Sequence, residues 1–571
     1  MMIKKISPKN RDNYIDLLQT IDNLKKNGIN SYLGNKGYTI YKICLTPKII
    51  DFIKEELTMK PVIQHSFTEA KSFPIYQESE KKLYIPRFWG INMFGYPKSL
   101  KISFGESIDL TFNGNLRDYQ TKVLNEYLKA IQFGSNIIEN KGNGSALIEL
   151  WTGAGKTVLG LKIIEALKKK TIIFVHKTFL KNQWIERIQQ YLPNARIGTI
   201  QGQIIDIDNK DIVLAMIQSV SMKNYNDTLF DSFGFSIYDE CHHMSSEIFC
   251  NCLKKCNTLY GLGLSATMDR KDGLTKIFKM YLGDICYKHS KNSSQDNILV
   301  KAIDFIVDDE EYNEVERDFR GQIKYSTMVS KVSNLNLRND FIVYVLESEL
   351  FINPDQQFIV LAQTKSLLNY LYKSIIHKNI ASVGYYIGGM KECDLKKSES
   401  KTIILATFSM AAEALDIKSL TSLFLASPKS DIIQAVGRIL REKHSNPLVI
   451  DIIDNHDVFQ NQFKKRRAFY NQKNYRIFRT TNENYQAYIK YMRSLDVNER
   501  SNIQKIDNTI FSIIKEDTSS INILDKVQKL WNYLLVKQSK NKKSEYIETN
   551  SETNSETNIN SNNEYKCYIK L

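Results

Sequence analysis

The feature that most constrains this chain is a strand, a short glycine-containing turn and a helix in immediate succession. A mostly apolar run at 146–151 predicts a buried strand, and apolar residues recur at helical spacing from Thr157 onward. The turn consists of Thr152, Gly153, Ala154, Gly155, Lys156 and Thr157. Backbone N–H groups in such a turn, and the positive end of the helix, bind a phosphate anion. The pattern predicts a nucleotide site, with Lys156 reaching the β- and γ-phosphates and the Thr157 hydroxyl binding Mg²⁺.

Two series of short apolar runs, separated by helical patterns, extend along the chain. The first lies at 146–151, 171–176, 211–217, 235–238 and 260–265, and the second at 358–362, 383–387, 402–406, 422–426 and 447–453. Continuous apolar strands that alternate with helices form a parallel sheet covered on both faces. We therefore expect two similar α/β domains in tandem.

The 571 residues are too many for one domain, and local composition predicts where the boundaries fall. We expect an N-terminal accessory domain at 1–112, which is a candidate to engage DNA, and a first α/β domain at 113–290. A linker at 291–330 and a second α/β domain at 331–480 should follow, and then a helical extension at 481–536 and a disordered tail at 537–571. The linker is polar and acidic, and the tail has almost no apolar residues. An aromatic segment at 83–97 forms either a small core, which we favour, or a base-stacking surface.

Composition restricts the class of protein and of partner. No stretch is long and apolar enough to span a bilayer, and the N-terminus lacks the apolar core of a signal peptide. The formal charge of +15 favours a polyanionic partner, although a lysine-rich solvated surface would give the same sum. The eight cysteines are scattered, as in proteins of reducing compartments.

Two other groups of residues are assigned structural positions. Cys250, Cys252 and Cys256 do not have the spacing of a common zinc site, so we expect free thiols in a helix. Asp451 and Asp454 lie on a late apolar run without the Glu-x-Lys of a nuclease, so we expect strand-end residues.

An acidic pair follows the apolar run at 235–238. Asp239 and Glu240 begin the sequence Asp-Glu-Cys-His-His. The carboxyl ends of parallel strands share one edge of a sheet, so these carboxylates should lie near the phosphate-binding turn. We expect Asp239 to hold Mg²⁺ through water and Glu240 to take a proton from the attacking water. For either residue alone, capping of the strand is the alternative.

Three further groups would complete such a site. Ser265 and Thr267 follow the next apolar run and can hydrogen-bond to the acidic motif. Gln120 has an amide that can pair with adenine through one donor and one acceptor. In the second domain, Arg438 and Arg441 lie on one helix face and can clamp a γ-phosphate, the alternative being a solvated basic helix.

These blocks, in this order, resemble the superfamily 2 helicases and translocases over about residues 84–475. The Asp-Glu-Cys-His-His subgroup looks closest to xeroderma-pigmentosum-type helicases, type III restriction translocases and the poxvirus transcript-release helicase. The segments at 84–95, 263–273 and 336–340 resemble helicases of large DNA viruses. The resemblance implies two tandem RecA-like domains with a small N-terminal α+β domain, a helical C-terminal extension, and ATP and Mg²⁺ as cofactors.

The resemblance also implies roles for individual residues. The nucleotide site would include Gln120, Lys156, Asp239, Glu240, Gln434, Arg438 and Arg441. Coupling of hydrolysis to strand movement would involve Ser265, Thr267 and Asp416. The nucleic-acid path would be lined by Lys177, Trp184, Gln218, Ser219, Thr364, Lys365 and Thr407. In the block that ends at Asp416, Ala414 replaces the usual glycine.

The implied activity is that of an ATP-dependent helicase moving 3′→5′, with DNA favoured over RNA, in viral transcription by transcript release or in repair. The implied partners are nucleic acid and transcription or repair proteins, with no membrane, for a monomeric motor in the virion or host cytoplasm. The alternatives are an RNA helicase, a nucleic-acid-binding subunit with a vestigial ATP site, and the motor of a restriction system. Intact Lys156, Glu240 and Arg441 oppose the vestigial site, and the lack of a nuclease motif opposes the restriction motor.

Overall fold

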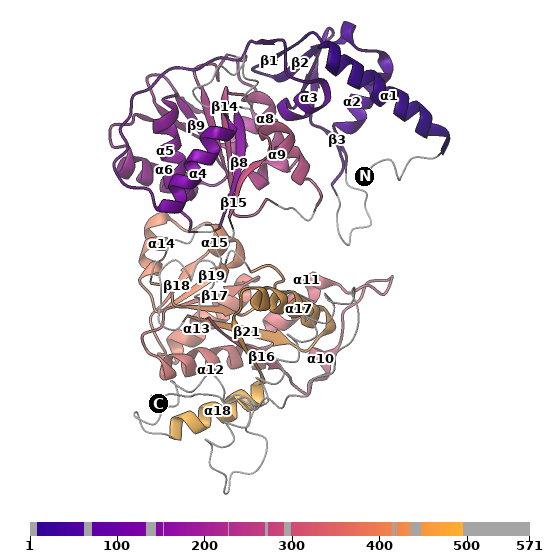
Figure 1. Ribbon diagram of the computed structural model, residues 1–571. Helices are drawn as coiled ribbons and strands as arrows, with labels where there is room; N and C mark the ends of the chain where they lie inside the picture. Colours follow the sequence, from indigo (N-terminus) through magenta and orange to yellow (C-terminus); the bar gives the residue numbers. More distant parts are fainter. Residues whose placement is uncertain are drawn as a thin grey trace, which may run out of the picture. The chain divides into compact units, whose positions relative to one another are not determined.

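The protein consists of two compact units, each built around one large, mainly parallel sheet (Figure 1). This computed structural model describes residues 8–61, 71–132, 144–151, 153–226, 228–268, 272–289, 298–413, 417, 419–432, 435–436 and 447–494. The units are Met1–Ser294 with Ser409–Lys418, and Gln295–Phe408 with Ser419–Leu571. In these described ranges, no helix has both the length and the apolar character needed to cross a bilayer.

The large sheet of the first unit confirms the parallel α/β fold expected there. Its strands are β8 (Ser145–Leu150), β9 (Thr171–Val175), β10 (Ile197–Gln201), β11 (Ile204–Asp206), β12 (Ile212–Met216), β13 (Phe235–Asp239), β14 (Tyr260–Ser265) and β15 (Ile285–His289). The order is β11-β10-β12-β9-β13-β14-β8-β15, and every pair except β10–β11 is parallel. All residues of β9, β12, β13 and β14 are buried, because helices cover both faces.

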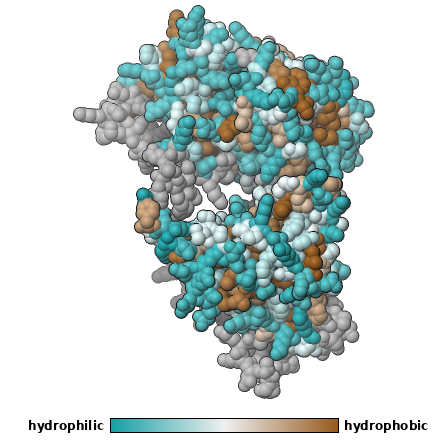
Figure 2. Space-filling view, turned by 180° about the vertical axis from the view of Figure 1, so that it is seen from behind, coloured by the Kyte–Doolittle hydropathy of each residue, from teal (hydrophilic) through white to brown (hydrophobic). Residues whose placement is uncertain are grey.

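Alternate residues of these strands enter two hydrophobic clusters on opposite faces of the sheet. One cluster contains Ile148 and Ile173, and is covered by α4 (Asp118–Ala130), α5 (Lys156–Leu167) and α6 (Thr178–Tyr191). The other contains Leu147 and Phe174, and is covered by α7 (Ile217–Met222), α8 (Cys250–Lys255) and α9 (Thr275–Leu282). The free thiols on and directly after α8 lie in this second cluster: Cys250, Cys252 and Cys256. The face drawn in Figure 2 is mainly hydrophilic, with hydrophobic residues in small separate patches.

The N-terminal elements form a small α+β layer that shares its core with the first unit's large sheet. They are α1 (Pro8–Asn27), β1 (Ser31–Gly34), β2 (Gly37–Tyr41), α2 (Pro47–Glu56), β3 (Thr58–Met59), β4 (Phe73–Pro74), β5 (Gln77–Glu78), β6 (Lys82–Ile85), α3 (Arg87–Phe94) and β7 (Ser99–Leu100). Trp89 and Phe94 are 7% and 1% exposed and join the cluster that contains Leu147. The interpretation of the aromatic segment as core is therefore confirmed.

A buried hydrogen bond and shared hydrophobic packing attach the N-terminal segment to the first unit's large sheet. Arg87 is buried, and its Nη1 donates at 3.1 Å to the carbonyl oxygen of Leu259, the residue directly before β14. Burial lowers the pKa of this guanidinium to about 10. Ile108 and Phe112 pack into the cluster around α5, although the expected boundary at 112 assigns them to the accessory domain.

The second unit contains a parallel sheet of seven strands in the order β18-β19-β17-β20-β21-β16-β22. The strands are β16 (Leu299–Phe305), β17 (Phe358–Ala362), β18 (Val383–Tyr386), β19 (Ile403–Thr407), β20 (Ser422–Leu425), β21 (Leu448–Asp454) and β22 (Arg476–Thr481). The helices are α10 (Glu310–Asn313), α11 (Tyr325–Asn334), α12 (Asn336–Ile352), α13 (Lys365–His377), α14 (Glu392–Glu399), α17 (Asp457–Gln472) and α18 (Asn482–Ser494). The expected tandem α/β arrangement is thus confirmed.

The second domain extends beyond both of its expected boundaries, at 331 and at 480. β16 lies within the expected linker at 291–330, yet it pairs with both β21 and β22. α18 falls in the expected extension, but Tyr485 and Tyr488 are buried in the second unit's core. The Tyr485 hydroxyl also donates to Glu349, which forms a buried ion pair with Lys301 of β16. Residues 495–571, including the expected tail, lie outside the described residues.

Buried ion pairs anchor β21 from the neighbouring helices. Arg338 of α12 pairs with Asp454 at 2.5 Å, and both side chains are fully buried. Arg466 of α17 pairs with Asp451 at 2.8 Å. Asp451 lies inside β21, so its assignment as a strand-end residue is wrong, whereas Asp454 does end the strand.

We expect Arg338→Met to destabilise the second unit by about 3–5 kcal/mol, because removing one partner leaves a buried charge without compensation. Arg493→Met is the matched control, since the Arg493–Glu347 pair is 42% exposed on both sides and contributes about 1 kcal/mol or less. Hydrogen exchange of β16 and β21 measures both effects. Equal protection in the two variants would contradict the prediction.

Candidate nucleotide site

Three neighbouring strands end at the edge of the sheet where the site lies. β13, β14 and β8 are adjacent and parallel, so their carboxyl ends lie side by side. Asp239 is the last residue of β13, Ser265 is the last of β14, and the phosphate-binding turn follows β8. The sheet therefore brings together three motifs that are far apart in the sequence.

The turn after β8 has the backbone conformation that its glycines permit. Gly153 and Gly155 have φ values of +85° and +75°. A Cβ at Gly155 would lie 2.6 Å from the Gln120 side-chain nitrogen, so a larger residue would require the Gln120 amide to move. Gly155 caps α5, whose first two residues are Lys156 and Thr157. The positive end of α5, the ammonium group and the hydroxyl thus occur in one turn of helix, which suits an anion.

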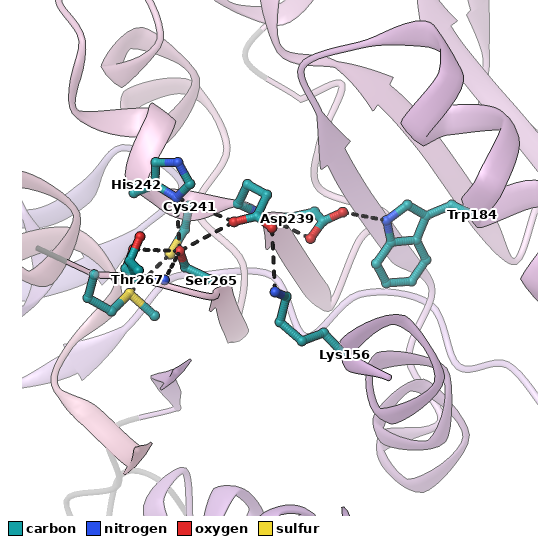
Figure 3. Close-up of polar contacts among 9 residues, drawn as sticks. Lys156, Trp184, Asp239, Cys241, His242, Ser265 and Thr267 are labelled. Carbon is teal, nitrogen blue, oxygen red and sulfur yellow. Dashed lines mark hydrogen bonds and ion pairs between the residues drawn. The ribbon is translucent and has the colours of Figure 1, made fainter. Parts of the chain in front are cut away.

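Lys156 and Glu240 form an ion pair across this edge. The Lys156 Nζ lies 3.4 Å from Glu240 Oε1, with side chains 12% and 21% exposed. Figure 3 shows Lys156 extending from α5 toward the carboxylates at the end of β13. Glu240 has a φ of +48°, a left-handed conformation that is uncommon for a residue with a Cβ and that turns the chain sharply after β13.

Asp239 is held by a tryptophan from the neighbouring helix (Figure 3). The Trp184 indole N–H donates to Asp239 Oδ2 at 2.9 Å, and the Glu240 backbone N–H donates to Oδ1 at 3.1 Å. Burial raises the pKa of Asp239, and the adjacent Glu240 charge raises it further. A cation beside this carboxylate would offset both effects. Trp184 is only 1% exposed, so the expectation that it lines a nucleic-acid path is wrong.

Ser265 and His242 connect the acidic pair with the end of β14. The Ser265 Oγ lies 2.8 Å from His242 Nδ1, 2.7 Å from the carbonyl oxygen of Thr267 and 3.4 Å from Glu240 Oε2. The Thr267 backbone N–H also donates to Ser265 Oγ at 3.2 Å. A change at Glu240 can therefore reach the segment after β14 through direct contacts.

Gln120 has a different set of partners from the one expected. Its Oε1 accepts from the Arg117 backbone N–H at 2.9 Å, and its Nε2 donates to the carbonyl oxygens of Ala154 and Gly155 at 3.0 and 3.3 Å. Tyr119 also donates its hydroxyl to Ala154 at 2.7 Å. Gln120 therefore braces the phosphate-binding turn, and an adenine contact would require its amide to exchange these bonds.

The residues expected on a nucleic-acid path lie at strand ends in both units. Lys177 precedes α6 after β9, and Gln218 donates to the carbonyl oxygen of His176 at 2.7 Å. Ser219 accepts from the Gly202 backbone N–H at 2.9 Å. In the second unit, Thr364 and Lys365 follow β17 at the start of α13, and Thr407 ends the neighbouring strand β19.

Several expected site residues lie outside the described residues: Thr152, Asp416, Gln434, Arg438 and Arg441. Their roles stay predictions. The part of Trp184 in holding Asp239 was not recognised from the sequence, because the two residues are distant along the chain and no local pattern links them. The bond from Tyr119 to Ala154 was missed for the same reason, although Tyr119 adjoins Gln120.

The donor set fits a nucleoside triphosphate with Mg²⁺. An ammonium group and a helix N-terminus are present for the phosphates, and Thr157 and Asp239 supply a hydroxyl and a carboxylate for the cation. Glu240 contacts both Lys156 and Ser265 and so lies between the phosphate-binding turn and the end of β14.

The matching family model and the relatives with similar sequences all point to one family of proteins. Residues 113–270 match the family model described as "Type III restriction enzyme, res subunit". A mimivirus protein named "Putative ATP-dependent RNA helicase L396" is 32% identical over 472 residues, which cover 79% of this chain and 87% of the relative. "Putative helicase 161L" of invertebrate iridescent virus 6 is 25% identical, covering 65% of this chain and 85% of the relative.

A third relative is "Putative ATP-dependent RNA helicase QP509L" of a Kenyan isolate of African swine fever virus. It is 25% identical over 377 residues, which cover 60% of this chain and 72% of the relative. The resemblance drawn from the sequence motifs is confirmed by these matches and by the two parallel-sheet units. The chain belongs to the superfamily 2 helicases that include these proteins of large DNA viruses, and it is an ATP-dependent helicase.

Proposed function

We propose that this helicase couples ATP hydrolysis to 3′→5′ movement along DNA. The observation that supports ATP hydrolysis is the 3.4 Å pair between Lys156 and Glu240, beside an Asp239 held by Trp184. This arrangement has a cation for the phosphates, a carboxylate for a metal ion and a second carboxylate for a proton. A vestigial site would have no need to retain all three. The 3′→5′ direction is what the resemblance to superfamily 2 helicases implies.

Each side chain has a proposed role. Lys156 binds and orients the β- and γ-phosphates, and Thr157 and Asp239 hold Mg²⁺. Bound Mg²⁺ would neutralise negative charge on the phosphates. Glu240 exchanges its contact with Lys156 for one with the attacking water and takes its proton. Ser265 and Thr267 in the first unit, with Asp416, couple hydrolysis to strand movement, and Gln434, Arg438 and Arg441 complete the nucleotide site.

The remaining features of the proposal concern substrate and setting. Backbone contacts from Lys177, Gln218, Ser219, Thr364, Lys365 and Thr407 would give little sequence preference. The match to a restriction-enzyme family model supports DNA as the polymer. We also propose a monomeric motor of viral transcription, by transcript release, or of repair, acting in the virion or host cytoplasm with transcription or repair proteins. The occurrence of the relatives in large DNA viruses supports only the viral setting.

RNA is the second candidate substrate. The mimivirus and African swine fever virus relatives are both named as putative RNA helicases. The motifs of the nucleotide site contact ATP rather than the polymer, so they do not separate the two substrates. Direct comparison of the polymers does.

We expect Lys156→Ala and Glu240→Gln each to lower ATP turnover at least about 100-fold, through loss of phosphate stabilisation and of the general base respectively. Glu240→Gln should still bind a fluorescent ATP analogue. Lys162→Ala, on the same helix α5, is the control and should retain turnover. Normal hydrolysis by Glu240→Gln would contradict the assigned base.

Trp184→Phe should raise the Mg²⁺ concentration for half-maximal turnover about tenfold, since a hydrogen bond to a charged group contributes roughly 1.5 kcal/mol or more. The cause is the lost indole donor, without which the pKa of Asp239 rises further. Mn²⁺ binding followed by electron paramagnetic resonance gives a readout independent of turnover. Trp89→Phe, a buried substitution in the same unit, controls for packing. An unchanged metal requirement in Trp184→Phe would rule out the role of the indole.

ATPase rates without polymer and with single-stranded DNA, duplex DNA or RNA test the substrate. We expect strong stimulation by DNA, with affinity that falls steeply as salt rises, because the contacts are to phosphates. Stimulation by RNA alone would select the second candidate. Equal rates with and without any polymer would refute movement along nucleic acid.

A further inference from the structure

A pocket of about 260 Å³ lies where the N-terminal elements meet the first large sheet. One wall is the turn between β1 and β2, which carries Asn35 and Lys36. The opposite wall comprises the segment after α7, with Tyr225 and Asn226, and the end of α8, with Lys254 and Lys255. Asn257, just beyond α8, donates to the Asn35 carbonyl oxygen at 3.0 Å, so the two walls are fixed to each other.

The pocket is positively charged. Among the described residues that line it are Lys36, Lys254 and Lys255, and none of these described lining residues is an Asp or Glu. Lys255 Nζ donates to three carbonyl oxygens, those of Val220 and Ser221 at 3.0 Å and that of Lys223 at 2.5 Å, which uses all three of its protons. Lys254 Nζ donates to the carbonyl oxygen of Pro74 at 2.9 Å. These carbonyl groups hold the ammonium groups in place without neutralising them.

Burial lowers the pKa of Lys254 and of Lys255, because the ammonium groups lose part of their hydration. An anion in the pocket would compensate for this loss. The amide groups of Asn35 and Asn226 supply neutral donors beside the charges.

An aromatic side chain lies beside these cations. Tyr225 is half-buried, and its ring packs edge-on against Phe230 at 6.0 Å. The Tyr225 hydroxyl donates to the Ser219 carbonyl oxygen at 3.1 Å. Ser219 is one of the residues expected on the nucleic-acid path, so that expected path and the pocket lining meet at this hydrogen bond. A nucleic-acid strand presents what the pocket would bind, namely phosphate anions and bases with flat faces.

We propose that this pocket binds a phosphodiester of the translocated strand and packs a base against Tyr225. The inference rests on the proposed function, and it extends the strand-binding surface from the first large sheet onto the N-terminal elements. Because these elements share a core with the sheet and are tied to it by Arg87, they hold the strand without moving relative to α7.

The test compares two double variants of the full chain that each remove two positive charges. Lys36→Gln with Lys254→Gln alters the pocket, and Lys129→Gln with Lys378→Gln alters exposed sites elsewhere. Fluorescence anisotropy with single-stranded DNA and RNA oligonucleotides is measured over a range of salt concentrations. We expect the pocket variant to bind the oligonucleotides about tenfold more weakly at physiological salt. The slope of the logarithm of its binding constant against the logarithm of the salt concentration should become shallower by about 1.4, because two phosphate contacts are lost. Its ATP hydrolysis in the absence of polymer should be unchanged.

Photo-cross-linking of an iododeoxyuridine oligonucleotide gives a second readout. We expect the wild-type protein to be labelled at Tyr225, with labelling reduced by the pocket variant and retained by the control. If both double variants behave alike and Tyr225 is unlabelled while the polymer still stimulates hydrolysis, the pocket proposal is wrong and the motor proposal stands. If no polymer binds the wild-type protein, both proposals fail.

Discussion

The parallel pairing of β13, β14 and β8 is the constraint on which the nucleotide site depends. Strands that run in one direction end at one edge, and that edge brings Lys156 to within 3.4 Å of Glu240. An antiparallel neighbour would send one of these residues to the opposite edge. The charge pair then keeps both long side chains in place, so the edge is organised around the position that a phosphate would take.

The same edge concentrates negative charge in a place that water reaches poorly. Asp239 and Glu240 are consecutive carboxylates, and burial together with their mutual repulsion raises the pKa of Asp239. The Trp184 indole and the Lys156 ammonium counteract this effect without removing it. A carboxylate in that environment gains from a divalent cation, which gives a physical reason for the metal preference that we propose.

The N-terminal elements extend this rigid framework beyond the sheet. Arg87 is buried against backbone carbonyl groups, and their oxygens compensate part of its lost hydration. The shared hydrophobic cluster makes the junction a solid surface, which allows a pocket with three lysines to persist there. The strand-binding role that we propose for these elements therefore depends on their junction with the sheet, where the pocket lies, more than on their own small fold.

The sequence by itself determined the strands that form mainly apolar runs, such as β9, β12 and β14, and the motifs placed directly after them. Residues buried on both faces leave an unbroken apolar run, and that signal is local. β10, with alternating burial, and β16, which carries Lys301 and Asp304, gave no such run and were missed. Only the tertiary structure decided that Trp184 holds Asp239, that Gln120 braces the phosphate-binding turn, and that a basic pocket lies beside Tyr225. Each of these depends on contacts between segments distant in the chain, whose energies come from packing geometry and have no counterpart in local composition.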